Sequence, residues 1–158
     1  MLVAIAVAVS VLRLQLSANV LLCHEVGAKA NKKQLTTATL EVGGVSELQG
    51  IARFKFHEGK VEEFKRLSAQ CIEIVRTKDT GTLQYDIYLN DDQSEAMVLE
   101  RYRDSEALIE HTAHLGDIGE AILSTGSVSG ELLGKPSAEL RERLANSPVR
   151  LFTPFLSM

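Results

Sequence analysis

His111 is the side chain in this sequence best suited to chemistry. It belongs to an apolar stripe, spaced by three or four residues, that predicts one face of a helix and contains Leu108, His111, Leu115, Ile118 and Ile122. Because an imidazole changes charge near neutral pH, His111 can act as a base or as a hydrogen-bond partner for a substrate hydroxyl. The alternative is a core histidine whose ring nitrogens are satisfied by neighbouring groups.

Two tyrosines and an arginine are the candidates for binding a substrate beside this histidine. Tyr85 and Tyr102 lie in predicted strands, where they can stack on an aromatic ligand or hydrogen-bond to it. Packing with a satisfied hydroxyl is the alternative for both. Arg53 lies in an earlier predicted strand and can orient an anionic oxygen, with a surface or interface ion pair as its alternative.

Other ionisable residues nearby are expected to be structural or solvated. We expect Glu100 to pair with Arg101 or Arg53, across the sheet or across a dimer. His114 falls at the edge of the apolar stripe and His57 in a turn, so we expect both in solvent. The sequence has no GxGxxG, P-loop, CxxC or HExxH motif, and its spacing reveals no nucleophile with a base and an orienting group.

The composition is that of an ordinary soluble domain with short additions. The chain has 158 residues, of which 45% are hydrophobic and 24% charged, and its formal net charge is −4. This charge argues against a nucleic-acid surface, which needs a basic face. Cys23 and Cys71 have no metal-type spacing, and Cys71 is expected to be a small core residue, so a reducing compartment is the default.

The N-terminal region is the hardest part of the sequence to interpret. Its first apolar run is too short for a transmembrane helix. A secretory signal would have basic residues before the run, and none are present. We expect a cytoplasmic protein that does not bind membranes, with a signal or anchor in residues 1–30 left open. Thr36–Val42 suggests an edge strand and Gly43–Gly44 a linker, so residues 1–48 are treated as an extension.

A folded domain is predicted over residues 49–134. Alternation or helical spacing predicts a strand at 51–56, a helix at 60–78, and strands at 82–89 and 96–103. A second helix follows, capped by Asp104 or Ser105 and ending near 124–126, and then a strand at 128–133. Gly81 is expected to end the first helix in a left-handed conformation. The order predicts an α+β, ferredoxin-like β-α-β-β-α-β fold with an antiparallel sheet and both helices on one face.

The last region, residues 135–158, predicts a short helix followed by a strand. Ser137 is suited to cap the helix, and Leu140 and Leu144 form its apolar pair. The strand is expected over Val149–Leu156, at an edge or reaching to another subunit, because Pro154 cannot donate to a ladder. The uncovered face of the sheet carries large residues, which favours a homodimer formed by sheet-to-sheet packing.

Several of these segments together resemble a known family. Gly59, Thr80–Asp86, Val98–Tyr102, Ala107 and His111 are similar to the pattern of the antibiotic biosynthesis monooxygenase (ABM) domain, over about residues 50–125. The resemblance implies a dimeric α+β barrel with the ferredoxin-like fold. Haem-degrading relatives use an Asn on the first strand, a Trp ending the third strand and a His on the second helix. Only His111 remains here, so the resemblance does not favour haem degradation.

The cofactor-free branch of that family provides the leading functional hypothesis. It implies a dry cavity between sheet and helices, where a base deprotonates a quinol or polyphenol and the anion reacts directly with oxygen. We therefore expect a homodimeric, cofactor-independent monooxygenase without a metal, with His111 as base and Tyr102, Tyr85 and Arg53 binding the aromatic substrate. The rival is a non-catalytic, small-molecule-binding or stress-associated dimer of the same fold. An open cavity holding a titratable group with a displaced pKa would favour the enzyme.

Overall fold

The structure, a computed structural model, describes residues 47–156. The expectations for the apolar N-terminal run, the edge strand Thr36–Val42 and the linker at Gly43–Gly44 lie outside these described residues. Within residues 47–156, no helix is both long and apolar enough to cross a membrane.

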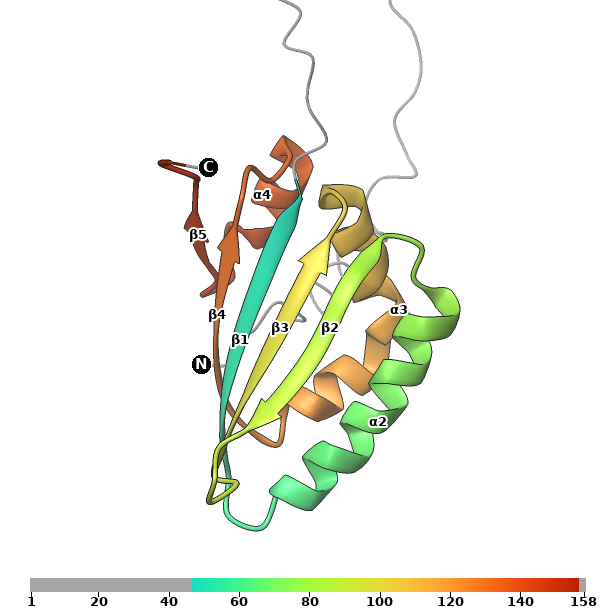
Figure 1. Cartoon of the computed structure of the whole chain (residues 1–158), viewed down its shortest axis with the longest axis vertical. Helices are drawn as coiled ribbons and strands as arrows, with labels where there is room; N and C mark the ends of the chain where they lie inside the picture. The colour runs from blue at the N-terminus through green and yellow to red at the C-terminus, as the bar shows by residue number, and fades with distance from the viewer. Residues whose placement is uncertain (1–46, 157–158) are drawn as a thin grey trace, which may run out of the picture.

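One layer of the molecule is a five-stranded sheet with the order β2-β3-β1-β4-β5 (Figure 1). Its strands are β1 (Leu48–Phe56), β2 (Thr82–Leu89), β3 (Glu95–Tyr102), β4 (Gly126–Leu133) and β5 (Arg150–Phe152). The pairs β1–β3, β1–β4 and β2–β3 are antiparallel, and β4–β5 is parallel. Strand β1 begins at Leu48, which is earlier than the sequence pattern indicated.

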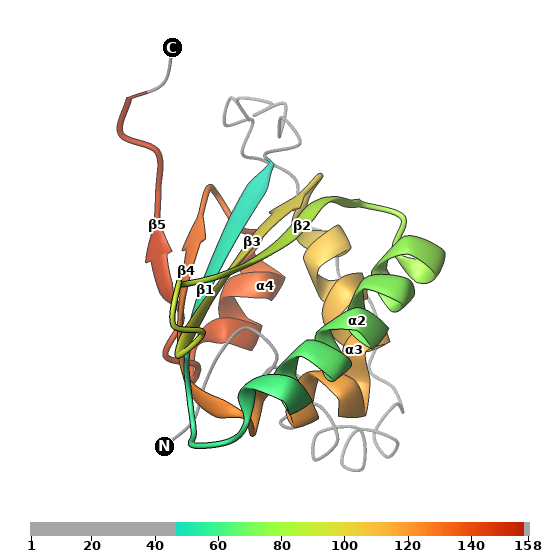
Figure 2. The ribbon, with the colours of Figure 1, turned by 60° about the horizontal axis from the view of Figure 1, so that its bottom comes forward.

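The other layer consists of helices α2 (Val61–Lys78) and α3 (Ser105–Leu123), which cover the same face of the sheet (Figure 2). This is the predicted ferredoxin-like β-α-β-β-α-β arrangement. Asp104 caps α3, because its side chain accepts a hydrogen bond from the backbone N–H of Ala107. The prediction that Asp104 or Ser105 begins this helix is therefore confirmed, with Asp104 as the cap.

Side chains alternate between the covered and uncovered faces of the central strands. In β1, Ala52 and Phe54 are buried against the helices, whereas Arg53 is exposed on the other face. In β3 the buried positions include Glu100 and Tyr102. Period-two geometry therefore places Glu100 on the apolar, helix-covered face and its neighbour Arg101 on the opposite face.

Aromatic packing fixes α2 on the sheet. The ring centroid of Phe64 lies 5.1 Å from that of Phe54 and 4.8 Å from that of Phe56. Leu67 and Cys71 continue the buried stripe of the helix. Cys71 is a fully buried free thiol, which confirms its predicted place in the core.

The turn between α2 and β2 differs from its predicted form. Gly81 is not in the left-handed region, and the helix instead ends at Asp79, whose backbone is extended. Glycine is required at position 81 for a steric reason: an added Cβ would lie 2.4 Å from Cβ of Ala107. A register shift between Thr82 and Gln84 also leaves Leu83 45% exposed, whereas strict alternation over residues 82–89 would place it on the same face as Tyr85.

The C-terminal region shares a core with the main domain. Helix α4 (Ala138–Leu144) is capped by Ser137, as predicted, and buries Leu140 and Leu144 beside Tyr102 and Leu108. Strand β5 lies at the edge of the sheet, as expected for a strand near a proline. It covers only Arg150–Phe152, so the predicted extent to residue 156 is wrong.

Candidate active site

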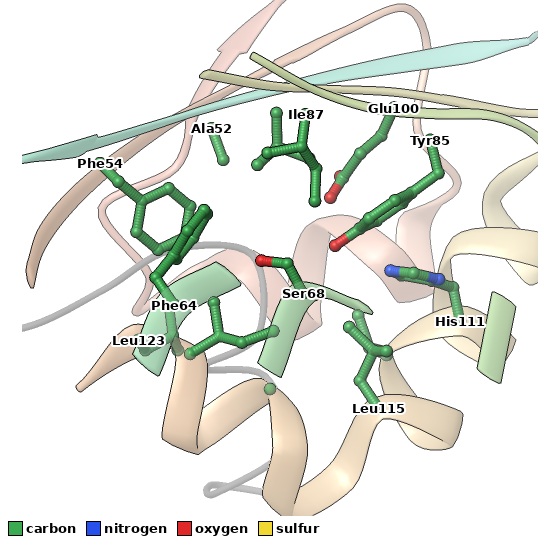
Figure 3. Close-up of a pocket in the computed structure, with 14 residues that line it drawn as sticks. Ala52, Phe54, Phe64, Ser68, Tyr85, Ile87, Glu100, His111, Leu115 and Leu123 are labelled. Carbon is green, nitrogen blue, oxygen red and sulfur yellow. The ribbon is translucent and has the colours of Figure 1, made fainter. Parts of the chain in front are cut away.

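A narrow cavity lies between the sheet and the two covering helices. Most of its lining is apolar, and its polar side chains are Ser68, Tyr85, Glu100, His111 and Thr112 (Figure 3). The centre of a water-sized molecule can occupy about 40 Å³ of it. This is room for a few water molecules, so a substituted aromatic ring can enter only if side chains move.

Asp79 anchors the histidines at one end of this region. Its Oδ2 lies 2.7 Å from Nδ1 of His111, and its Oδ1 lies 2.7 Å from Nδ1 of His114. The hydroxyl of Thr82 donates a third hydrogen bond to Oδ2, also at 2.7 Å. The Asp79 side chain is 1% exposed and that of His111 is 2% exposed. A buried carboxylate thus holds two imidazole rings that lie one helical turn apart on α3.

This geometry sets the protonation pattern. Burial alone would raise the pKa of Asp79, but hydrogen bonds from His111, His114 and Thr82 lower it to about 2. An ionised carboxylate only accepts hydrogen bonds, so the Nδ1 atoms of both histidines carry hydrogen. In the neutral form of the His111 ring, Nε2 is then the nitrogen with a lone pair, and the ring points toward Tyr85 (Figure 3). The arrangement is that of an oriented general base.

Two of the three histidine predictions agree with the structure. His111 lies on the buried face of α3, as predicted. His57 is exposed, also as predicted. The expectation that His114 is solvated is wrong, because its side chain is only 29% exposed and is paired with Asp79.

Tyr85 lies between the buried cavity and an open groove on the protein surface. It lines both the buried cavity and an open groove between α2 and β2, and Ile87 does the same. The thiol of Cys71 donates to its hydroxyl at 3.2 Å, and its ring centroid lies 5.5 Å from that of His111. Burial raises the pKa of Tyr85 well above its ordinary value, and Glu100 adds to this effect when it is ionised, so Tyr85 remains a neutral phenol at working pH.

Tyr102 lies behind His111 rather than in the cavity. Its ring is fully buried, with its centroid 5.3 Å from that of His111. Burial, with Glu100 next in importance, raises the pKa of Tyr102 well above its ordinary value. Its hydroxyl has no hydrogen bond of ordinary geometry among the described residues. The structure thus brings Tyr102 to the histidine but does not place it in the cavity lining.

Arg53 is separated from the other candidates. It lies on the uncovered face of the sheet with a side chain that is 51% exposed, and its Nε is 3.8 Å from Oε2 of Glu131. Its Nη1 also lies 3.9 Å from Sδ of Met97. The side chain therefore makes surface contacts, the alternative interpretation given above, and does not line the cavity.

The position of Glu100 differs from its prediction, and this difference matters most for the site. Its residue is only 7% exposed and lines the cavity, so the expected pairing with Arg101 or Arg53 is wrong. Those arginines lie on the other face of the sheet because they occupy outward positions of their strands. Its Oε2 has no hydrogen-bond partner. Burial raises the pKa of Glu100, and His111 and Tyr102 counteract part of that effect.

Asp79 and Ser68 are site residues that the sequence pattern did not identify. Asp79 directly follows the predicted helix over residues 60–78, a position that by itself indicates only a helix end, although two histidines three residues apart on α3 could have indicated a shared acidic partner. Ser68 lies on the buried stripe of α2, and its hydroxyl has no partner. Within residues 47–156, no group of three or more His, Cys, Asp or Glu side chains is arranged to hold a metal ion.

Comparisons with known proteins relate this chain to one family and one fold. Residues 50–115 match the family model described as antibiotic biosynthesis monooxygenase. No curated protein matches the chain. A similar solved structure is MupZ from Pseudomonas fluorescens, with 22% identity, TM-score 0.64, and coverage of 71% of this chain and 88% of that chain.

Two further solved structures have the same fold. Rv0793 from Mycobacterium tuberculosis is 27% identical, with TM-score 0.50 and coverage of 58% of this chain and 96% of that chain. SnoaB from Streptomyces nogalater, described as a cofactor-independent oxygenase, is 17% identical, with TM-score 0.50 and coverage of 59% of this chain and 96% of that chain. At such identity the likeness to SnoaB concerns the fold alone.

Proposed function

Residues 50–115 of this chain belong to the antibiotic biosynthesis monooxygenase family, and from this premise we propose a cofactor-independent monooxygenase acting on a quinol or polyphenolic aromatic. The observation that carries the proposal is the hydrogen bond between Asp79 and Nδ1 of His111. It fixes the imidazole with its basic nitrogen available to a largely apolar cavity. The displaced pKa values of Asp79 and Glu100 favour an enzyme over a packed interior.

The first step is removal of a proton from a substrate hydroxyl by Nε2 of His111. The imidazolium that forms is stabilised by Asp79, which stays ionised throughout. The substrate becomes an electron-rich anion held away from water. Tyr85 is a neutral phenol beside this position, so it can donate a hydrogen bond to the ring substituents or stack on the ring.

The anion then reacts with oxygen without an external reductant. One electron passes to O₂, and the resulting radical pair joins at a ring carbon to give a hydroperoxide, whose proton returns from His111. Loss of water converts the C–OOH carbon, which still carries a hydrogen in the keto form, into a carbonyl. The balance is CH₂ + O₂ → C=O + H₂O, with four electrons from the substrate and one oxygen atom in each product.

Substrate entry requires the cavity to open. We assign the entrance to Tyr85 and Ile87, because they lie between the cavity and the open groove beside β2. The non-catalytic rival, a ligand-binding dimer, draws its support from the small volume of the cavity. Turnover separates the two functions.

Oxygen uptake with a reduced naphthoquinol tests the proposal. Purified full chain should consume oxygen faster than a protein-free blank, which corrects for autoxidation of the quinol. His111→Ala should reduce the excess rate over the blank by about 10²-fold or more, which is the rate contribution typical of a general base. His57→Ala, in an exposed turn, is the matched control and should retain it. Equal rates in His111→Ala and wild type would refute the role of His111.

A further inference from the structure

Glu100 is a buried carboxyl group without a cationic partner. Its residue is 7% exposed, and it takes part in none of the ion pairs between described residues. The titratable groups that interact with it come from every surrounding element: Cys71 on α2, Tyr85 on β2, Tyr102 on β3 and His111 on α3. None of these is a permanent cation.

Such an environment favours the protonated acid. An isolated carboxylate in an apolar interior is strongly unfavourable, and the group takes up a proton instead. The raised pKa of Glu100, caused mainly by burial, agrees with this conclusion. A neutral carboxyl group is also a hydrogen-bond donor, whereas the ionised form only accepts.

The cavity also contains oxygens that lack partners. Oε2 of Glu100 and Oγ of Ser68 are both buried and make no hydrogen bond of ordinary geometry, and the Tyr102 hydroxyl is the polar group that interacts with the Glu100 carboxyl from its own strand. Each such group destabilises the fold unless water or a ligand satisfies it. In Figure 3 the carboxyl group of Glu100 points from the sheet into the cavity, toward the same space as Tyr85 and His111.

We propose that Glu100 is a further ligand-contacting residue, which in its protonated form donates a hydrogen bond to the ligand oxygen whose proton His111 removes. The ligand class is a phenol or enol, because a single hydroxyl oxygen can donate to Nε2 of His111 and accept from Glu100. This inference rests on the proposed function for the role of His111. An ionised Glu100 would repel the developing oxyanion, whereas a neutral carboxyl group stabilises it.

Infrared difference spectroscopy and ligand binding test this assignment without turnover. The variants are Glu100→Gln, which keeps a neutral donor, and Glu100→Leu, which removes it. Glu95→Gln is the matched control, because it makes the same change at an exposed position of the same strand. Phenol and benzene are the probes, since they differ by the one hydroxyl group under test.

At pH 7 the wild type and Glu95→Gln should show the carbonyl band of a protonated carboxyl group, and Glu100→Gln should lack it. Wild type should bind phenol about tenfold more tightly than benzene, the effect of one good hydrogen bond. Glu100→Gln should keep this preference within about threefold, and Glu100→Leu should lose it.

Four outcomes would overturn the assignment. They are absence of the infrared band in wild type, no preference for phenol in wild type, an unchanged preference in Glu100→Leu, and an equal loss in Glu100→Gln and Glu100→Leu. The last would mean that the ionised form binds. Absence of oxygen uptake would count against the proposed function and leave these results intact, so the two failures are distinguishable.

Discussion

At the scale of single residues, the central feature is one carboxylate that positions two imidazoles. Asp79 fixes the tautomer of His111 through Nδ1, and His114 occupies the other oxygen. His114 therefore helps to hold the carboxylate in place and to keep it ionised. A histidine that sequence analysis assigns to solvent is in fact a support for the base.

Replacing Asp79 with Asn should reduce the rate of oxygen uptake, and it should also weaken the dependence of fold stability on acidic pH. The amide can present its NH₂ group to Nδ1 and favour the wrong tautomer, so the rate of oxygen uptake should fall by roughly 10²-fold or more.

The pKa of Asp79 lies at about 2, below its ordinary value of 3.8, so its ionisation stabilises the fold above pH 4. This contribution, up to about 2 kcal/mol, is lost as pH falls from about 4 to 2.

Urea unfolding between pH 7 and pH 2 measures that contribution. The free energy of unfolding of wild type should fall more steeply than that of Asp79→Asn in the window between pH 4 and pH 2. Asp86→Asn, an exposed position on β2, is the control and should follow wild type. Parallel curves for wild type and Asp79→Asn would contradict the depressed pKa.

The periodicity of α3 is sufficient to predict that His111 faces inward, but no local pattern reveals its partner. Asp79 is 32 residues away in the chain and meets His111 only because α2 and α3 pack side by side. Glu100 is a different case. Alternation in β3 already places it with Val98 and Tyr102, whereas the expected ion pair with Arg101 or Arg53 requires the opposite face of the sheet.

At the scale of elements, close contact between the α2–β2 turn and α3 positions the acid and its histidines. Gly81 allows the turn to approach Ala107 at the start of α3. Further along the same helix, Gly116 has φ 44° and ψ −126°, which breaks the helix between Leu115 and Gly119, both of which line the cavity. The close approach does not follow from helix propensity, because it depends on what packs against Gly81. At Gly116 a Cβ would meet open space, so glycine is favoured there by the positive φ alone.

Adding a methyl group at Gly81 should destabilise the fold. Gly81→Ala places its Cβ 2.4 Å from Cβ of Ala107, so we expect a loss of about 1–3 kcal/mol in urea unfolding. The double variant Gly81→Ala with Ala107→Gly removes the clash and should lose less than the sum of the two single changes. Additive losses would show that the contact does not determine the residue at position 81.

At the scale of the whole molecule, the sheet has one covered and one uncovered face. The uncovered face contains the apolar pair Ile51 and Leu99, which are directly opposite each other in the β1–β3 register, together with Met97. No helix within the described residues lies on it (Figure 1). We therefore propose a homodimer with these faces in contact, as the family resemblance implies.

Light scattering after size-exclusion chromatography tests the dimer. The chain has a mass of 17.3 kDa, and the wild type should elute with about twice this value. Leu99→Lys places a charge at the centre of the proposed interface and should shift the mass toward that of one chain. Gln70→Lys adds the same charge on an exposed position of α2 and should leave the mass unchanged. A wild type of one-chain mass would contradict the proposal.

Isotope labelling tests whether this cavity catalyses the insertion of oxygen from O₂ into a substrate. Wild type, His111→Ala and a protein-free blank would be supplied with a reduced naphthoquinol under ¹⁸O₂, and early product would be analysed by mass spectrometry before carbonyl exchange with water. We expect one ¹⁸O atom in the oxygenated product of wild type, with little such product in His111→Ala or the blank. Product without ¹⁸O, or equal labelled product in all three samples, would contradict it.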